Sequence, residues 1–139
     1  MSAPISSAAS TPRWMTWTGL VLSFFPVLIL LSSAWVRGTQ HTNAVAEIVS
    51  SYGYPESAIA RIVIAECVLV VLYLVPQTSI LGAILMTGYL GGAMAAHLRI
   101  GDTARAMIPL VAAILAWGGL YLRDSRVREL IPFRRPGSA

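Results

Sequence analysis

A single carboxylate, Glu66, lies in the middle of a largely apolar run that extends over residues 59–75 and contains one other charged residue, Arg61. A charged side chain at the centre of a lipid bilayer costs about 3 kcal/mol or more unless it is neutralised or paired. Arg61 precedes Glu66 by five residues, about 140° around a helix, so it is not a simple intrahelical partner. We therefore expect Glu66 to be neutral and to have either a functional role or a structural hydrogen bond to a neighbouring helix.

A second group of polar residues closes the glycine-rich run GAILMTGYLGGAMAAHLRIGD, which spans residues 82–102. Counting ~1.5 Å of rise per residue places Tyr89, like Glu66, at a depth of ~12–14 Å. His97 lies within a residue or two of the surface. The sequence therefore predicts a deep polar layer of Glu66 with Tyr89 or Thr87, and a shallow layer formed by His97, Arg61, Arg99 and Asp102.

These residue types point to proton chemistry on an apolar molecule. A desolvated Glu can carry a proton and His titrates near neutral pH, so Glu66 and His97 are the candidate catalytic residues. Proton exchange with a lipophilic quinone and acid–base isomerisation of an apolar substrate are both open. The candidate binding residues, which line the outer polar layer, are Tyr89, Arg99, Asp102 and Arg61.

Other chemistries have little support. The chain has two His and one Cys, which predicts no metal site, and we do not expect a haem held by His97. Cys67 has no second thiol in the chain with which to form a disulfide. A net charge of only +4 does not indicate nucleic-acid binding.

The elements that carry these residues are predicted to cross a membrane. Of the 139 residues, 56% are hydrophobic and 12% are charged, whereas a soluble domain carries about 25% charged residues. Apolar segments long enough to span the hydrocarbon core predict an all-α, integral membrane four-helix bundle in residues 13–131. The predicted helices cover residues 14–36, 59–75, 80–98 and 106–122.

The connections refine this fold. Short links predict antiparallel neighbours for the last three helices, and Asn43 is placed to cap a short interfacial helix in the long first outer loop. A cleaved signal peptide is an alternative for the first segment, but its apolar core continues past the Ser32-Ser33-Ala34 stretch and contains Pro26. Residues 1–12 and the basic tail 132–139 are predicted to be disordered.

Arginine placement predicts orientation. Arg123 and four further arginines follow the last predicted helix, so the positive-inside rule predicts that both termini are cytoplasmic. All ten cationic residues are arginine, which is a hint of a bacterial source and hence of a bacterial inner (cytoplasmic) membrane. Gly88 and Gly92 are spaced for close helix packing, within the chain or in a homo-oligomer.

Several motifs together resemble the DoxX-like membrane proteins. They are the run TGYLGGAMAAHLRIGD, Gly53-Tyr54-Pro55, the Glu66 helix, Pro76-x-Thr78 and the closing LYLRD at residues 120–124. The resemblance covers residues 37–132, and Gln77 replaces a basic residue expected in that family. It implies a four-helix inner-membrane protein, with polar positions at Glu66, Tyr89, His97, Arg99 and Asp102.

The resemblance also implies a role beside oxidoreductases, because relatives are associated with thiosulfate:quinone oxidoreduction and with thiol and oxidative stress. Three functions stay open for this chain. The first is a membrane subunit that binds a quinone-like molecule and supports an oxidoreductase partner. The second is a cofactor-independent acid–base isomerase that acts on an apolar substrate, and the third is a membrane scaffold without a ligand. Whether it is an enzyme is left open.

Overall fold

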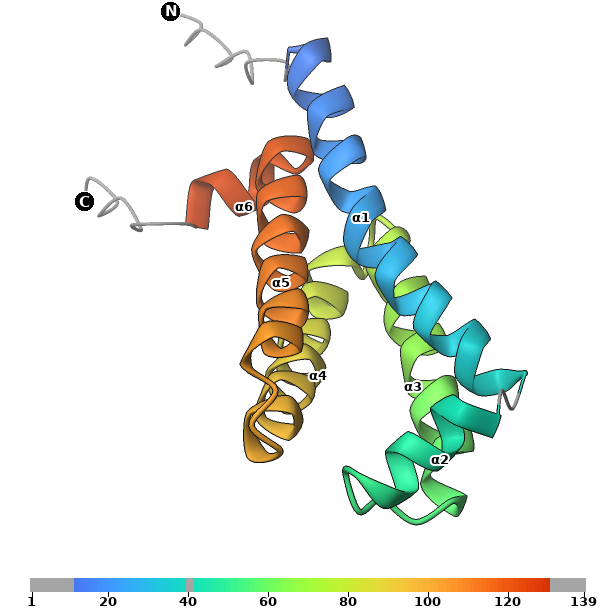
Figure 1. The fold of residues 1–139 in the computed structure, drawn as a ribbon. Coiled ribbons are helices and arrows are strands. Elements are labelled where there is room, and N and C mark those ends of the chain that lie inside the picture. The colour runs from blue at the N-terminus through green and yellow to red at the C-terminus, as the bar shows by residue number, and fades with distance from the viewer. Residues whose placement is uncertain (1–11, 40–41, 131–139) are drawn as a thin grey trace, which may run out of the picture.

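The computed structural model describes residues 12–39 and 42–130, which form six helices and no strand (Figure 1). Four of the helices are long and apolar enough to cross a membrane, so the fold is an all-α membrane bundle, as predicted. The helices are α1 (Arg13–Gly38), α2 (Thr42–Ser50), α3 (Ser57–Leu74), α4 (Ser79–Arg99), α5 (Thr103–Arg123) and α6 (Ser125–Leu130).

The predicted spans coincide with α1, α3, α4 and α5 to within three residues at each end. The short outer helix is α2, which begins at Thr42, so Asn43 lies inside its first turn rather than before it. The short helix α6 was not predicted. Both tails predicted to be disordered lie, apart from Pro12, outside the described residues.

The bundle consists of two arms that are in contact at one end (Figure 1). One arm pairs α1 with α3, and the other pairs α4 with α5; α1 also packs on α5, and α3 on α4. The arms meet near the end where α1 begins and α5 finishes, which we call the closed end. They diverge toward α2, which we call the open end.

Glycines permit the close approach of helices at the closed end. A Cβ atom added to Gly19 of α1 would lie 2.8 Å from the carbonyl oxygen of Gly119 in α5, and one added to Gly82 of α4 would collide with the backbone of Tyr73. Such backbone contacts require a residue without a side chain. The glycines that hold the bundle together are therefore Gly19, Gly82 and Gly119.

The expected close packing at Gly88 and Gly92 within the chain is wrong. No atom of another helix lies within 4 Å of a Cβ added at either position. Both residues face a pocket instead. The small residues at these positions leave room for the pocket. A four-residue spacing of small residues is therefore compatible with an open pocket as well as with close helix packing.

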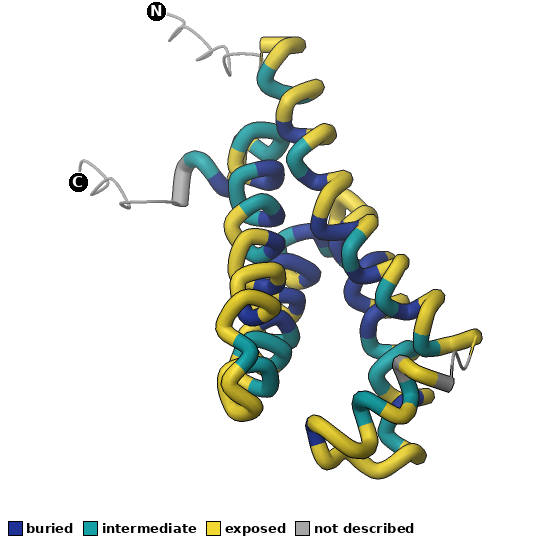
Figure 2. Tube along the Cα trace, viewed as in Figure 1, coloured by how far each residue is buried: buried dark blue, intermediate teal, exposed yellow. Residues whose placement is uncertain are grey.

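Polar contacts reinforce the closed end, where buried positions concentrate (Figure 2). The hydroxyl of Tyr73, which is fully buried, lies 2.9 Å from Ser23 Oγ of α1 and donates to the Ala116 carbonyl oxygen of α5 at 2.8 Å. The guanidinium of Arg123 lies over the Tyr73 ring, 4.8 Å from its centroid. One aromatic side chain of α3 thus contacts α1 and α5.

Arg126, in α6, ties the end of the bundle to the α3–α4 turn. Its guanidinium donates to the Pro76 carbonyl oxygen at 3.1 Å and forms an ion pair with Asp124 at 2.9 Å. Hydrogen bonds from the Arg126 side chain lower the pKa of the Asp124 carboxyl below its ordinary value of 3.8. The basic residues beyond α5 therefore contribute to folding as well as to net charge.

Candidate functional site

Glu66 is the centre of a polar cluster between α1, α3 and α4. Its side chain is 2% exposed, and its Oε1 atom accepts hydrogen bonds from Ser33 Oγ at 3.0 Å and from the Tyr89 hydroxyl at 2.6 Å. Arg37, in the last turn of α1, donates to the same oxygen at 2.5 Å. Of the predicted deep layer of Glu66 with Tyr89 or Thr87, the structure shows the contact with Tyr89, whereas Thr87 accepts a hydrogen bond from Trp117. Glu66 also forms an ion pair with Arg37, which differs from the neutral side chain expected from the sequence.

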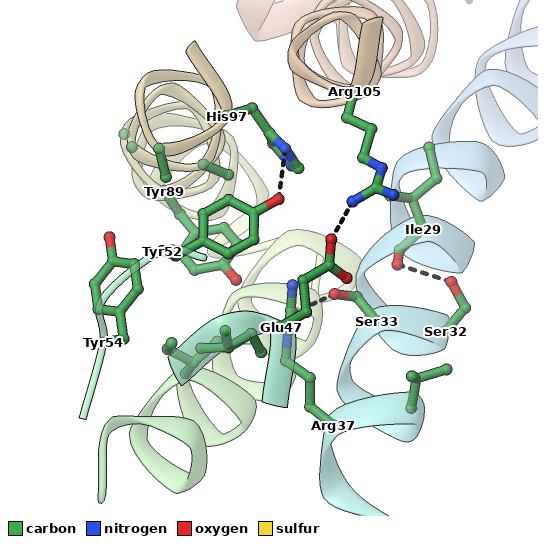
Figure 3. A pocket seen from close by; sticks show the side chains of 17 residues that line it. Ile29, Ser32, Ser33, Arg37, Glu47, Tyr52, Tyr54, Tyr89, His97 and Arg105 are labelled. Atoms are coloured by element: carbon green, nitrogen blue, oxygen red, sulfur yellow. Dashed lines mark hydrogen bonds and ion pairs between the residues drawn. The ribbon is translucent and has the colours of Figure 1, made fainter. Parts of the chain in front are cut away.

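His97 belongs to a second polar cluster at the open end (Figure 3). Its Nδ1 atom lies 2.9 Å from the hydroxyl of Tyr52, which follows α2, and the two rings pack edge to face. Arg99 donates to the backbone carbonyl oxygen of Tyr52. When Tyr52 donates to Nδ1, the imidazole is neutral and its Nε2–H is free to donate to another group.

A third contact joins α2 to α5. Arg105 of α5 forms an ion pair with Glu47 of α2, which is visible in Figure 3. Asp102 accepts a hydrogen bond from the backbone N–H of Arg105 at 3.0 Å, and its carboxylate lies 3.2 Å from Arg105 Nε. Asp102 is therefore the N-cap of α5 and also orients the arginine that contacts α2.

These clusters surround a pocket of about 680 Å³ between the arms at the open end. Its apolar wall includes Ile29, Val36, Ile48 and Ile62, and the small residues Gly88, Gly92, Ala93 and Ala96 of α4 form another side. Its polar residues are Ser32, Ser33, Arg37, Glu47, Tyr52, Tyr54, Tyr89, His97 and Arg105. A volume of about 300–1,000 Å³ with mostly apolar walls and a few polar groups is typical of small-molecule sites.

A smaller cavity of about 130 Å³ adjoins this pocket. The two share Arg37, Tyr89, His97 and four further residues, and only the smaller cavity is lined by Glu66. Leu90 of α4 and Ile108 and Pro109 of α5 complete its apolar side. We call this cavity the deep end of the site.

The structure thus brings together only part of the predicted site. Tyr89 and His97 line the pocket, and Glu66 lines the deep end. Arg99 and Asp102 line neither cavity. Arg99 contacts the backbone of Tyr52, and Asp102 caps α5. Arg61 is exposed, and its guanidinium lies 3.5 Å from Ser57 Oγ within its own helix, so the structure does not place it with Glu66.

Sequence reasoning missed the cation that pairs with Glu66. Arg37 directly follows the first predicted span, and its position by itself indicates only a charge in the outer loop. Ser33 stands one helical turn before Arg37 on the same face, and this pair of polar residues at the end of an apolar helix was the available signal. Tyr52, Glu47 and Arg105 carried no comparable signal, because they meet His97 and one another only through tertiary structure.

No group of three or more His, Cys, Asp or Glu side chains in residues 12–39 and 42–130 is arranged to hold a metal ion. The site combines a buried carboxylate, three tyrosines and an imidazole with an apolar space. Such an arrangement can hold a lipophilic molecule that has a polar head.

The fold and this site define a multi-pass helical membrane protein with a pocket between its helices. Residues 12–119 match the sequence profile of the DoxX-like family, which confirms the resemblance. The chain belongs to the DoxX-like family. Neither the curated proteins nor the solved structures include a significant match.

Proposed function

We propose that this DoxX-like protein binds a lipophilic, quinone-like molecule in the pocket between its arms and supports a membrane oxidoreductase. The observation that carries the proposal is the 680 Å³ pocket itself, which combines apolar walls with hydrogen-bonding side chains from separate elements. A quinone has an apolar ring and tail and carries oxygens that need hydrogen-bond partners, so its chemistry fits such a site.

The polar side chains have defined roles in this proposal. His97, held by Tyr52, donates from its Nε2–H to an oxygen of the ligand head near the open end. Tyr89 and Arg37 lie on the side toward the deep end, where both contact Glu66. Glu66 and His97 together are the groups that exchange protons with the ligand when it changes redox state.

The electrons for such a change come from a partner subunit in this proposal. The chain has one cysteine, Cys67, and so has no dithiol of its own. Cys67 is exposed on α3 and does not line the pocket. We therefore assign the chain a ligand-binding role beside an oxidoreductase, in a bacterial cytoplasmic membrane, with both termini on the cytoplasmic side.

Extraction of bound lipids tests this proposal. The protein is purified in mild detergent, and the extracted lipids are identified by mass spectrometry. We expect a quinone at near-stoichiometric amount in the wild type and a large loss from Gly92→Leu, whose side chain enters the pocket.

The matched control is Gly91→Leu, because Gly91 is exposed, has no neighbour within 4 Å and does not line the pocket. It should retain the quinone. Absence of any quinone from the wild type, or equal retention by both variants, contradicts the proposal. An isomerised apolar compound as the bound species would instead support catalysis of the isomerase type.

A further inference from the structure

The two oxygens of Glu66 are used unequally. Oε1 accepts from Ser33, Arg37 and Tyr89, whereas Oε2 accepts no hydrogen bond from any described residue. Oε2 is fully buried, and the whole residue is 2% exposed. Most buried polar atoms in proteins have a hydrogen-bond partner, so an unpartnered carboxylate oxygen requires an explanation.

The cavity beside Glu66 provides one. Glu66 lines the deep end, the cavity of about 130 Å³ that adjoins the large pocket. A cavity of roughly 150 Å³ is known to hold a benzene molecule, so the deep end matches one aromatic ring in size. Leu90, Ile108 and Pro109 supply apolar contacts for such a ring.

The charge of the cluster decides which kind of polar group fits beside Oε2. Arg37 forms an ion pair with Glu66 through Oε1, at 2.5 Å. A carboxylate only accepts hydrogen bonds. The neighbouring donors that contact it, from Ser33, Arg37 and Tyr89, all contact Oε1. A partner for Oε2 must therefore donate.

We propose that the deep end binds a phenolic or hydroquinone O–H that donates to Glu66 Oε2, so that the site prefers the reduced, hydroxyl-bearing form of its ligand. This inference rests on the proposed function and adds the redox form of the ligand. A quinone carbonyl oxygen at the same place would face Oε2, and neither oxygen can donate. Both acceptors would then lose their water without gaining a hydrogen bond. The oxidised form therefore binds more weakly.

Two matched ligand pairs test the inference on the purified full-length protein in detergent micelles. The first pair is 4-nonylphenol and 4-nonylanisole, in which the oxygen carries a hydrogen in the first compound and a methyl group in the second. The second pair is decylubiquinol and decylubiquinone, measured without oxygen. A hydrogen bond to a charged group favours the donor by about tenfold or more, so we expect the phenol and the quinol to bind at least tenfold more tightly than their partners, as measured by ligand-dependent thermal stabilisation.

Glu66→Gln gives the second arm of the test. When the glutamine oxygen occupies the Oε1 position, its NH₂ group occupies the Oε2 position and offers a donor. The tenfold preference should then be lost, because a phenol oxygen, an ether oxygen and a quinone carbonyl can all accept from this NH₂ group. Thr87→Val is the matched control, since Thr87 accepts from Trp117 at 2.8 Å and lines neither cavity.

The outcomes separate this inference from the proposed function. If both members of each pair bind the wild type equally, or the oxidised and methylated members bind more tightly, Oε2 does not receive a donor from the ligand. The pocket then still binds a quinone-like molecule, but the inference is wrong. If no member of either pair binds, the proposed function fails, and the inference fails with it. The binding of the two ligand pairs to the wild type tests the inference even if Glu66→Gln does not fold.

Discussion

Arg37, in the last turn of α1, lies 2.5 Å from Glu66 in the middle of α3, and this pair joins the two helices of one arm. Glu66 is 2% exposed, whereas Arg37 is 27% exposed at the edge of the pocket. The buried charge therefore has its partner on another helix, at the point where the pocket and the deep end meet.

Arg37→Met should destabilise the protein, because it leaves the Glu66 carboxylate buried without a cation. We expect a loss of about 3 kcal/mol, at the low end of the range for a broken buried ion pair, since Arg37 is partly exposed. The measurement is denaturant unfolding in detergent. Adding Glu66→Gln should restore most of the stability, and Arg61→Met, which removes an exposed arginine of α3, should have little effect. An additive double variant would contradict the pairing.

The contact of Glu66 with Tyr89 was predictable because depth follows from residue count along straight helices. Both residues lie about the same number of turns from the open end, so their helices bring them to one level. The rotation of each helix about its axis does not follow from that count. The approach of Arg37 depends on how α1 packs on α3, and this packing does not follow from the residues around Arg37 or Glu66 alone.

Gly88 and Gly92 show a different limit of sequence reasoning. Small residues every fourth position favour close helix packing, and the same pattern also leaves space for a ligand. The choice depends on whether another helix fills that space. Here the arms diverge, because Gly19, Gly82 and Gly119 draw the helices together only at the closed end. Nothing in the local sequence around Gly92 records that divergence.

Gly119→Ala should destabilise the bundle. Its added Cβ would collide with Ser23 Oγ and lie 2.8 Å from the Gly19 carbonyl oxygen, so α1 and α5 would have to separate. Overpacking of this kind costs about 1–3 kcal/mol. Gly91→Ala is the matched control, because a Cβ there meets no atom within 4 Å. Thermal unfolding in detergent should show a lower midpoint for the first variant and an unchanged or higher one for the second; equal midpoints would exclude close packing at Gly119.

The proposed topology predicts opposite labelling of the two ends of the bundle. In a Cys67→Ser background, Ser51→Cys adds an exposed thiol after α2, and Ser125→Cys adds one at the start of α6. In intact cells, a membrane-impermeant maleimide should label position 51 and leave position 125 unlabelled until the cells are permeabilised. The reverse pattern would place both termini outside.

Asp124 predicts a pH dependence of stability at the closed end. Hydrogen bonds from Arg126 lower the pKa of Asp124 in the folded protein below its ordinary value of 3.8, so its charge stabilises the fold above that value. This contribution is lost as the pH falls from 3.8 through the lower folded pKa. The difference in unfolding midpoint between wild type and Asp124→Asn should be constant from pH 7 to pH 5 and shrink below pH 3.8. A difference that grows on acidification would contradict the assignment.

Glu47 and Arg105 should control local opening of the pocket more than global stability. Their side chains are 43% and 53% exposed, so solvent screens the pair, yet it joins α2 to α5. Local opening of a loosely packed segment is separate from global unfolding. Glu47→Gln should therefore leave the unfolding midpoint unchanged and speed amide hydrogen exchange in residues 47–54 at least twofold.

The same variant should release a bound ligand faster, because α2 and Tyr52 cover the site from the open end. Glu56→Gln is the matched control, since it removes an exposed carboxylate immediately before α3 that does not line this pocket. It should alter neither amide exchange in residues 47–54 nor ligand release. If Glu47→Gln also leaves both rates unchanged, the ion pair with Arg105 does not hold α2 over the pocket, and the contacts of Tyr52 with His97 and Arg99 are sufficient.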